Sequence, residues 1–263
     1  MIKIAILAAA AAFATMTPVM AQQSRPLPES ETLRSVDPAQ RRITEEIVRD
    51  YILRNPEIVL EAIRILQARE QAAVGERALH AVAANNTELR HDPTTPVGGN
   101  RDGDVTIVEF FDYACPYCRN AHPILAQLAK DDPNVRIVYK EFPVLGEASV
   151  AAARVGVAVH LLAPARYEAF HAAMFQARGR LSVELAVQTA VEVGVDRVRL
   201  LDAINSEEVS ALIAKNVRLA EAIGVNGTPG FLIGDTIVPG LIQADQLKQL
   251  IAQARDACST CER

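Results

Sequence analysis

The 263-residue chain contains no tryptophan, only 5% aromatic residues, and no excess of basic side chains. Its net charge is −5, so the basic surface typical of nucleic-acid binding is not indicated. Beyond the first residues, no segment approaches the ~18 consecutive apolar residues that suggest a membrane-spanning helix. No cysteine is left over, because all four belong to two Cys-X-X-Cys motifs.

The beginning of the chain has the pattern of a secretory signal peptide. Lys3 supplies a positive charge, residues 4–16 are apolar, and Val19-Met20-Ala21 suits cleavage after Ala21. We therefore expect residues 1–21 to be removed and the cysteines to reside in an oxidising compartment, where disulfides persist. An uncleaved membrane anchor is the alternative interpretation.

The most informative motif is Cys115-Pro116-Tyr117-Cys118, which follows an apolar run and precedes a helical pattern. This order places the cysteine pair at a helix N-terminus, where unpaired N–H groups and the macrodipole stabilise a thiolate. We expect Cys115 to be the nucleophile and the more exposed of the two sulfurs, and Cys118 to resolve a mixed disulfide, as thiol–disulfide exchange requires. Pro116 and Tyr117 are expected to tune the pair.

Two other interpretations of the cysteines remain. The first is an inert disulfide. The second is a zinc site, but the two motifs are about 140 residues apart, far beyond the spacing of zinc ribbons. No metal site or other cofactor is predicted. His122 could share a helix face with Cys118, although an ordinary helix histidine is the simpler reading.

Two amphipathic helices are predicted before residue 93. Asp37-Pro38 and Asn55-Pro56 each resemble a helix cap followed by proline, and residues 22–36 have the polar composition of a flexible tether. A helix pair must bury its apolar stripe, either on its own chain or against another copy. A polar stretch with Pro93, Pro96, Gly98 and Gly99 favours self-association, so we interpret residues 37–92 as a helical oligomerisation region.

The remaining sequence predicts an α/β fold. The order is a strand at 105–111, the helix after the cysteine motif, a strand at 135–139, and helical sequence over 147–222. Two short strands around Gly234-Asp235 and a helix over 244–257 complete the pattern.

This order resembles the thioredoxin fold carrying an inserted helical subdomain. The stretch from Val108 to Cys118, VEFFDYACPYC, is similar to the active-site strand and motif of the DsbA-like family of bacterial exported thiol–disulfide oxidoreductases. We assign residues 93–257 to such a domain. The stretches that also carry the resemblance are Glu141-Phe142-Pro143, Phe170-His171 and Gly227-Thr228-Pro229-Gly230. The two N-terminal helices resemble the oligomerisation region of the ScsC branch, some of whose members are trimeric.

The resemblance implies further site residues. Thr228 and Pro229 are implied to form a cis peptide that presents backbone to an extended substrate beside Cys115, whereas an ordinary trans turn is the alternative. Threonine before this proline implies isomerase or reductase behaviour. Glu109 is implied to assist proton movement at the resolving Cys118; otherwise it is a strand residue that faces solvent.

Cys258-Ser259-Thr260-Cys261 lies in the tail, residues 258–263, and the family core does not require it. A peripheral disulfide, an accessory redox pair and metal capture by the thiols are the three interpretations of this second motif.

The function predicted is therefore a periplasmic protein thiol–disulfide oxidoreductase that leans toward isomerase or reductase activity. Its expected partners are unfolded or mis-oxidised exported proteins, a membrane redox partner, and further copies of itself in a dimer or trimer. The first alternative is a DsbA-like oxidase that donates its disulfide. The second is a copper-binding or copper-protective protein, because soft thiolates select Cu(I).

Overall fold

The computed structural model describes residues 37–261, and of residues 258–261 it describes the backbone alone. The expected signal peptide, residues 1–21, and the expected tether, residues 22–36, lie outside this range. The chain forms two compact units, divided between Ile65 and Leu66. Within the described range, no helix is both long and apolar enough to cross a bilayer.

The first unit contains helix α2 (Pro38–Arg54) and the beginning of helix α3 (Glu57–Ala84). Asp37 caps α2 as predicted, since its carboxylate accepts a hydrogen bond from the Gln40 N–H at 3.4 Å. Asn55 was predicted to cap the helix that follows it. Instead its side-chain amide donates to the carbonyl of Tyr51 at 2.8 Å, which caps the C-terminus of α2.

Large apolar side chains of this unit are exposed, and α2 has no buried residue. So many exposed apolar side chains on two consecutive helices are typical of an interaction site. We call them the α2–α3 apolar surface, and its members are Ile43, Ile47, Val48, Tyr51, Ile52, Leu53, Ile58, Val59, Leu60, Ile63 and Ile65.

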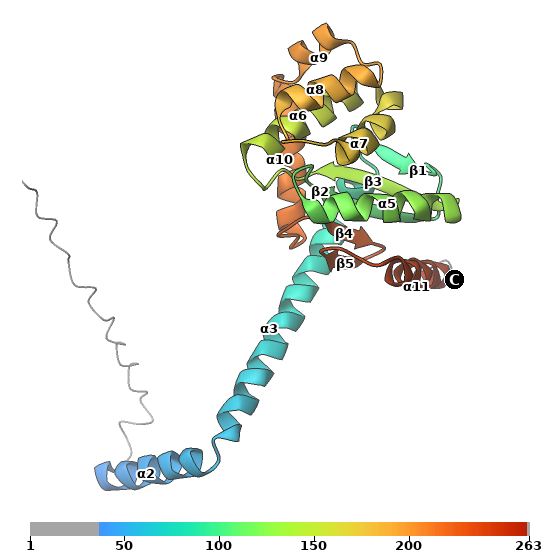
Figure 1. The fold of residues 1–263 in the computed structure, drawn as a ribbon. Coiled ribbons are helices and arrows are strands. Elements are labelled where there is room, and N and C mark those ends of the chain that lie inside the picture. Colours follow the sequence, from blue (N-terminus) through green and yellow to red (C-terminus); the bar gives the residue numbers. More distant parts are fainter. Residues whose placement is uncertain (1–36, 262–263) are drawn as a thin grey trace, which may run out of the picture. The chain divides into compact units, whose positions relative to one another are not determined.

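The second unit is built around a five-stranded sheet in the order β1-β3-β2-β4-β5 (Figure 1). β2 and β3 are parallel and are connected by helix α5, whereas the other neighbouring strands are antiparallel. The sequence pattern did not predict β1. The bounds are β1 (Val97–Gly99), β2 (Val105–Phe111), α5 (Pro116–Asp131), β3 (Val135–Glu141), β4 (Gly230–Ile233) and β5 (Thr236–Pro239).

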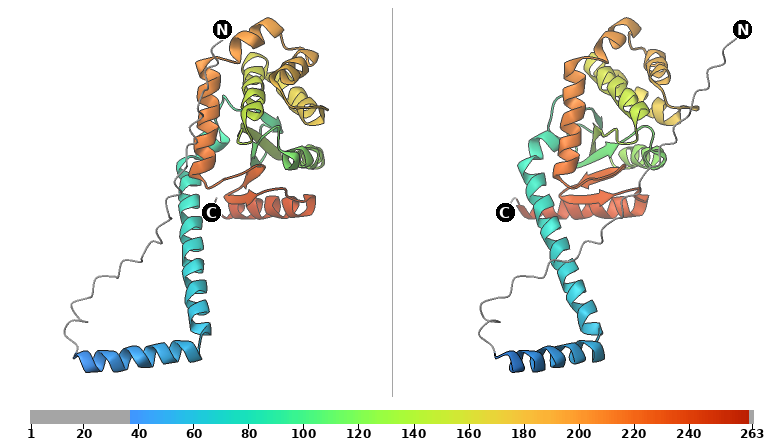
Figure 2. Two further views of the ribbon diagram at one scale, coloured as in Figure 1. Left: turned by 60° about the vertical axis from the view of Figure 1, so that its left-hand side comes forward. Right: turned by 90° about the vertical axis from the view of Figure 1, so that its left-hand side faces the viewer.

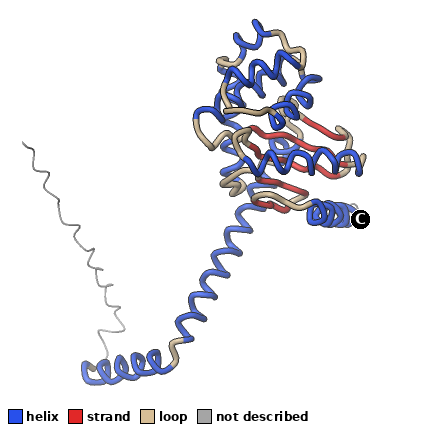
Figure 3. Tube along the Cα trace, in the orientation of Figure 1, coloured by secondary structure: helices blue, strands red, loops and turns tan. Residues whose placement is uncertain are grey.

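The segment between β3 and β4 is helical, as predicted, and β5 is followed by one long helix (Figures 2 and 3). Serine or aspartate side chains cap α8, α9 and α10. The order of elements is therefore βαβ, a helical insertion, and ββα. The remaining helices are α4 (Asn86–Arg90), α6 (Glu147–Leu162), the 3₁₀ turn η1 (Pro164–Arg166), α7 (Tyr167–Gln176), α8 (Val183–Glu192), α9 (Arg197–Ala203), α10 (Glu207–Ala222) and α11 (Ala244–Cys261).

The central strands are buried on both faces, which explains their nearly continuous apolar sequence. Because side chains alternate along a strand, Ile107 and Phe111 face one cluster, which also contains Cys118 of α5. Val108 and Phe110 face a second cluster, which includes residues of α3, α4 and α10. The cysteine motif thus lies over the first face of the sheet.

The polar stretch after the N-terminal helices is not a free linker. Leu89 is fully buried in the second cluster, and the buried Lys140 donates to the Glu88 carbonyl and to Thr95 Oγ1, both at 2.8 Å. Burial opposes ionisation of Asp92, but hydrogen bonds from Lys215 and Thr94 outweigh it and lower its pKa to about 2. The predicted region 37–92 therefore includes residues that belong to the second unit.

Candidate active site

The cysteine motif begins directly after β2. Cys115 occupies the N-cap position of α5, and Pro116 is its first helical residue. The turn before it is closed by a hydrogen bond from the Cys115 N–H to the Asp112 carbonyl at 3.0 Å. Cys115 is therefore placed at the end of α5 where helical N–H groups lack intrahelical partners, an end that favours negative charge.

The two cysteines are free thiols with different surroundings. Cys115 is 4% exposed and Cys118 is 0% exposed. Burial raises the pKa of the Cys118 thiol far above its ordinary value, and the Glu109 charge and Cys115 add to the effect. Tyr117, by contrast, is 59% exposed. Both cysteines are therefore buried, and Cys115 is the less buried of the two.

Thr228 and Pro229 lie against the cysteine pair. Their peptide bond is cis, and the Cys115 thiol donates to the Thr228 carbonyl at 3.2 Å. The sheet produces this contact, because β4 pairs with β2 and aligns Gly230 with Phe110. Two motifs that are more than a hundred residues apart in the sequence thus form one site.

Glu109 is completely buried on β2, which rules out the solvent-facing alternative. Alternation places it between Ile107 and Phe111, on the same face of the sheet as Cys118. Neither carboxyl oxygen has a hydrogen-bond partner among the described residues. Burial raises the pKa of Glu109 to about 8, so at neutral pH the carboxyl group is mostly protonated and can exchange a proton.

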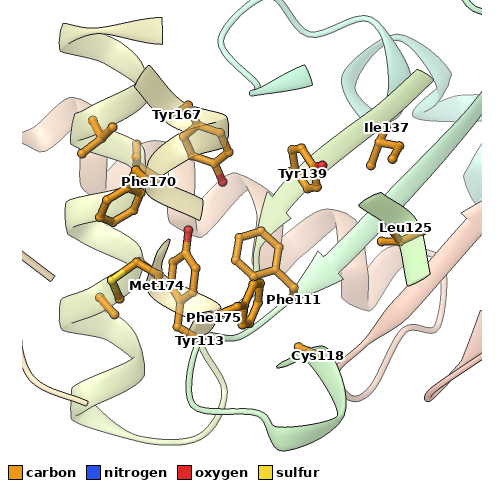
Figure 4. Close-up of a cluster of buried hydrophobic side chains, with 14 of the residues drawn as sticks. Phe111, Tyr113, Cys118, Leu125, Ile137, Tyr139, Tyr167, Phe170, Met174 and Phe175 are labelled. Carbon is orange, nitrogen blue, oxygen red and sulfur yellow. The ribbon is translucent and has the colours of Figure 1, made fainter. Parts of the chain in front are cut away.

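A buried polar network next to this site was not predicted from the sequence. The Tyr113 hydroxyl lies 3.1 Å from Nδ1 of His171, and the Tyr167 hydroxyl donates to Oε1 of Glu141 at 3.3 Å. Figure 4 shows the hydroxyl groups of Tyr113 and Tyr167 pointing toward each other. Burial raises the pKa of Glu141 well above its usual value and lowers that of His171 well below, so both groups are neutral. This network joins β3 to α7.

Gly156 on α6 allows Glu141 to fit, and its replacement is a test of the packing. A Cβ atom at position 156 would collide with Oε1 of Glu141 and approach Cε2 of Tyr113 to 3.4 Å. We expect Gly156→Ala to reduce the free energy of unfolding by about 1–3 kcal/mol, as overpacking does, despite the better helix propensity of alanine. Urea unfolding measures the change.

Gly75→Ala on α3 is the matched control. A Cβ atom there meets nothing within 4 Å, so the same substitution should stabilise the protein by up to about 1 kcal/mol. If Gly156→Ala lowers the free energy of unfolding no more than Gly75→Ala does, the Glu141 side chain is not held as tightly as its hydrogen bond to Tyr167 implies.

Three other observations concern residues near the site. His122 packs against the ring of His171, with ring centroids 5.2 Å apart, and burial lowers its pKa. Arg119 donates to the Phe175 and Ala177 carbonyls at 2.7 and 2.9 Å, which fixes the start of α5 to the end of α7. Among residues 37–257, whose side chains the structure describes, no group of three histidine, cysteine or acidic side chains is arranged to hold a metal ion.

The second cysteine motif was expected to follow the last helix. Instead α11 continues to Cys261, so Cys258 and Cys261 lie on its final turn. Their side chains are outside the described part of the structure, and the three interpretations of this motif stay predictions.

The comparison with known protein families agrees with this geometry. The model of the DSBA-like thioredoxin domain matches residues 106–252. The chain belongs to the DSBA-like family. Residues 40–73 also match the copper resistance protein ScsC N-terminal domain. The predicted resemblance to DsbA-like proteins with an ScsC-type N-terminal segment is thus confirmed.

Individual relatives of this DSBA-like chain include exchange proteins and ScsC. A thioredoxin-like oxidoreductase from Silicibacter pomeroyi DSS-3 is 44% identical with a TM-score of 0.63, and the match covers 65% of this chain and 98% of that one. Proteus mirabilis ScsC in a transitional conformation is 28% identical with a TM-score of 0.63, over 83% and 98% of the two chains. The thiol:disulfide interchange protein DsbA of Bordetella pertussis is 29% identical over 199 residues, which are 70% of this chain and 94% of the relative.

The predicted fold class, a thioredoxin fold with an inserted helical subdomain and a preceding helical segment, is confirmed. The DSBA-like chain is a thiol–disulfide oxidoreductase.

Proposed function

We propose that this chain exchanges disulfides with exported proteins in the periplasm, that Cys115 and Cys118 carry the reaction, and that it favours isomerisation or reduction. The observation that carries the proposal is the 3.2 Å contact between the Cys115 thiol and the Thr228 carbonyl. It places the less buried of the two sulfur atoms beside the backbone of the cis peptide, where strand-like binding of an extended substrate would bring a substrate disulfide to Cys115. A periplasmic thioredoxin-like protein of Salmonella enterica is 31% identical to this chain.

The reaction begins with one common step and then follows one of two routes. The Cys115 thiolate attacks one sulfur of a substrate disulfide, which forms a mixed disulfide and releases a substrate thiolate. In isomerisation, another substrate thiolate attacks the mixed disulfide, and Cys115 leaves unchanged. In reduction, Cys118 loses its proton, attacks Cys115, and releases the second substrate thiolate. The enzyme then holds the Cys115–Cys118 disulfide and needs a membrane reductant to regain its dithiol.

The α2–α3 apolar surface supports an assembly of several copies. Its eleven side chains in the described unit are exposed, and the segment overlaps the match to the ScsC N-terminal domain. Contact between copies would remove this surface from water. Several cysteine sites would then act on one misfolded substrate, which suits an isomerase.

A charge on this surface tests the proposal in the full chain. Ile47→Asp together with Ile63→Asp is expected to convert the oligomer to a monomer and to reduce reactivation of scrambled ribonuclease at least fivefold, since a buried unpaired charge destabilises an interface by several kcal/mol. Sedimentation measures the mass on the same samples. Gln67→Asp, at an exposed polar position of α3, is the control. A monomeric parent chain, or equal isomerase activity in all three proteins, contradicts the proposal.

The similarity to DsbA of Bordetella pertussis favours an oxidase as the second candidate. An oxidase should form disulfides in reduced ribonuclease and keep this activity in the Ile47→Asp/Ile63→Asp protein. A copper-protective protein is the third candidate, supported by the ScsC N-terminal match alone. It should bind Cu(I) tightly and show little exchange of disulfides.

A further inference from the structure

A small cavity lies between the sheet and the helical insertion. Its volume is about 10 Å³, which is that of one water-sized sphere. None of its lining residues belongs to the cysteine motif or to the Thr228-Pro229 segment. Its polar lining comes from the segment before β1, from β3, from α6 and from α10, and consists of Thr94, Thr95, Tyr139, Glu141, His160 and Asn216.

Two buried polar atoms of this lining have no hydrogen-bond partner among the described residues. They are Oε2 of Glu141 and Nδ1 of His160, and the two residues are 1% and 8% exposed. A buried polar atom that forms no hydrogen bond destabilises the fold, and a buried water molecule commonly supplies the missing bonds. The volume and the two unpartnered atoms together fit one water molecule.

The other carboxyl oxygen of Glu141 belongs to the polar network behind the cysteine motif. Oε1 accepts from the Tyr167 hydroxyl at 3.3 Å. Glu109 pairs with Tyr139, two residues before Glu141, and alternation puts both acids on the same face of the sheet. Burial raises the pKa of Glu141, and a charge on Glu109 raises it further, so the two carboxyl groups are close enough to interact. Glu141 therefore connects this network with the cavity.

His160 continues the polar groups from the cavity toward the surface. Burial lowers the pKa of His160, the Arg101 charge adds to this effect, and Asp92 opposes it. The ring is therefore neutral near pH 7 and can accept a proton. Asp92 in turn forms an ion pair with Lys215, whose side chain is partly exposed. Polar groups thus extend from Glu141 to the solvent-accessible side of α10.

A mixed disulfide at Cys115 blocks the direct way out for the proton of Cys118. Cys118 is 0% exposed and Cys115 is 4% exposed, so a substrate bonded to Cys115 covers the little access that exists. Cys118 must nevertheless become a thiolate before it attacks Cys115. Its proton must therefore leave through the interior of the protein.

We propose that one water molecule binds in the cavity, between Oε2 of Glu141 and Nδ1 of His160, and completes a proton path from the cysteine motif to the surface. The Cys118 thiol gives its proton to the Glu109 carboxylate, and Glu109 gives one to Glu141. Glu141 releases a proton from Oε2 to the water, the water releases one to Nδ1 of His160, and His160 releases one to solvent. The net change is one proton moved from Cys118 to solvent.

The inference rests on the proposed exchange reaction, so the test observes the water and the reaction separately. A high-resolution crystal structure of the full chain should show one ordered water bonded to both unpartnered atoms. Val157→Ile adds a methyl group to an apolar residue that lines the cavity, so it should exclude the water and leave every polar group of the path in place. Val159→Ile is the matched control, because Val159 is buried on the same helix but does not line the cavity.

Single-turnover reactions with a peptide disulfide separate the formation of the mixed disulfide from its resolution by Cys118. Val157→Ile is expected to slow resolution about tenfold, which is less than the ~10²-fold effect of removing a general base, because slower exits for the proton remain. The ratio of the resolution rates in H₂O and D₂O should rise, since proton transfer then limits the step. The formation of the mixed disulfide should keep the parent's rate, because Cys115 attacks as a thiolate.

His160→Phe removes the proton acceptor beyond the water and keeps a ring in its place. It should slow resolution as Val157→Ile does, and the double variant should be little slower than either, because residues that act in one path are not additive. A cavity without water in the parent chain, additive effects, or a Val157→Ile protein that resolves as fast as Val159→Ile would overturn the inference. A parent chain that forms no mixed disulfide would instead refute the exchange function itself.

Discussion

A chain with Cys115 replaced by serine is expected to lose thiol–disulfide exchange, with the rate falling to the uncatalysed background. A serine hydroxyl is not ionised near neutral pH and cannot replace a thiolate as nucleophile or leaving group. Cys118 cannot compensate, because it is 0% exposed and burial raises the pKa of its thiol. Reduction of insulin, followed by turbidity, measures the loss.

Cys118→Ser is the matched variant and should behave differently. Cys115 keeps its place at the start of α5, so the first attack still occurs, but no thiol remains to resolve the mixed disulfide. The covalent complex with substrate should accumulate and be visible by mass spectrometry. If the complex accumulates in the Cys115→Ser protein instead, the two roles are reversed.

Glu109→Gln is expected to slow the step in which Cys118 resolves the mixed disulfide by about 10²-fold, a typical contribution of general acid–base catalysis. Glu109 is buried on the same face of the sheet as Cys118, and burial raises its pKa to about 8. Its carboxylate form can accept the thiol proton, and its protonated form can return one, whereas glutamine does neither. Single-turnover measurements against pH isolate this step. Glu221→Gln, at an exposed position of α10, is the control.

The same substitution should change how stability depends on pH. In the unfolded chain Glu109 titrates near 4.5, and in the native protein near 8. Between these values the native state keeps a proton that the unfolded state has released, so the free energy of unfolding falls as pH rises. The loss is on the order of 4–5 kcal/mol over this window, at 1.36 kcal/mol for each pKa unit. Urea unfolding at pH 5, 6.5 and 8 should show this decline in the parent chain and a much flatter profile for Glu109→Gln. If the parent chain and Glu109→Gln show parallel profiles, Glu109 is not the group that makes the free energy of unfolding depend on pH.

Sequence patterns predicted those parts of the fold in which neighbouring residues specify the structure. The continuous apolar run in β2, the Gly234-Asp235 turn and the Asp37 cap each act over a few residues, so they are visible without the tertiary structure. β1 was missed because it is short and rich in glycine. Gly98 lies against the Tyr139 side chain, where a Cβ atom would come within 2.7 Å of the hydroxyl oxygen. Gly98 weakens the sequence pattern of a strand, but its lack of a side chain is what allows β1 to pair with β3.

The active site likewise combines residues that local sequence patterns identify with residues that only the tertiary structure brings together. The cysteine motif and Thr228-Pro229 are recognisable as motifs, and Glu109 stands out as an acid in an apolar strand. No sequence pattern identifies Asp112. Its carboxylate accepts hydrogen bonds from the N–H groups of Val144 and Leu145, more than thirty residues away. The pairing of Tyr113 with His171 likewise joins the turn after β2 to α7 of the insertion, across 58 positions. Long-range contacts of this kind follow from the completed fold.

The complete burial of Cys118 has a consequence for survival in the presence of peroxide. Oxidants attack accessible thiolates, and each further step from sulfenic to sulfonic acid makes the damage harder to reverse. Cys118 is shielded, so oxidation begins at Cys115. A sulfenic acid formed there condenses with the thiol three residues along the chain, and the product is the Cys115–Cys118 disulfide. The protein thus converts the first stage of oxidative injury into a form that belongs to its own working cycle.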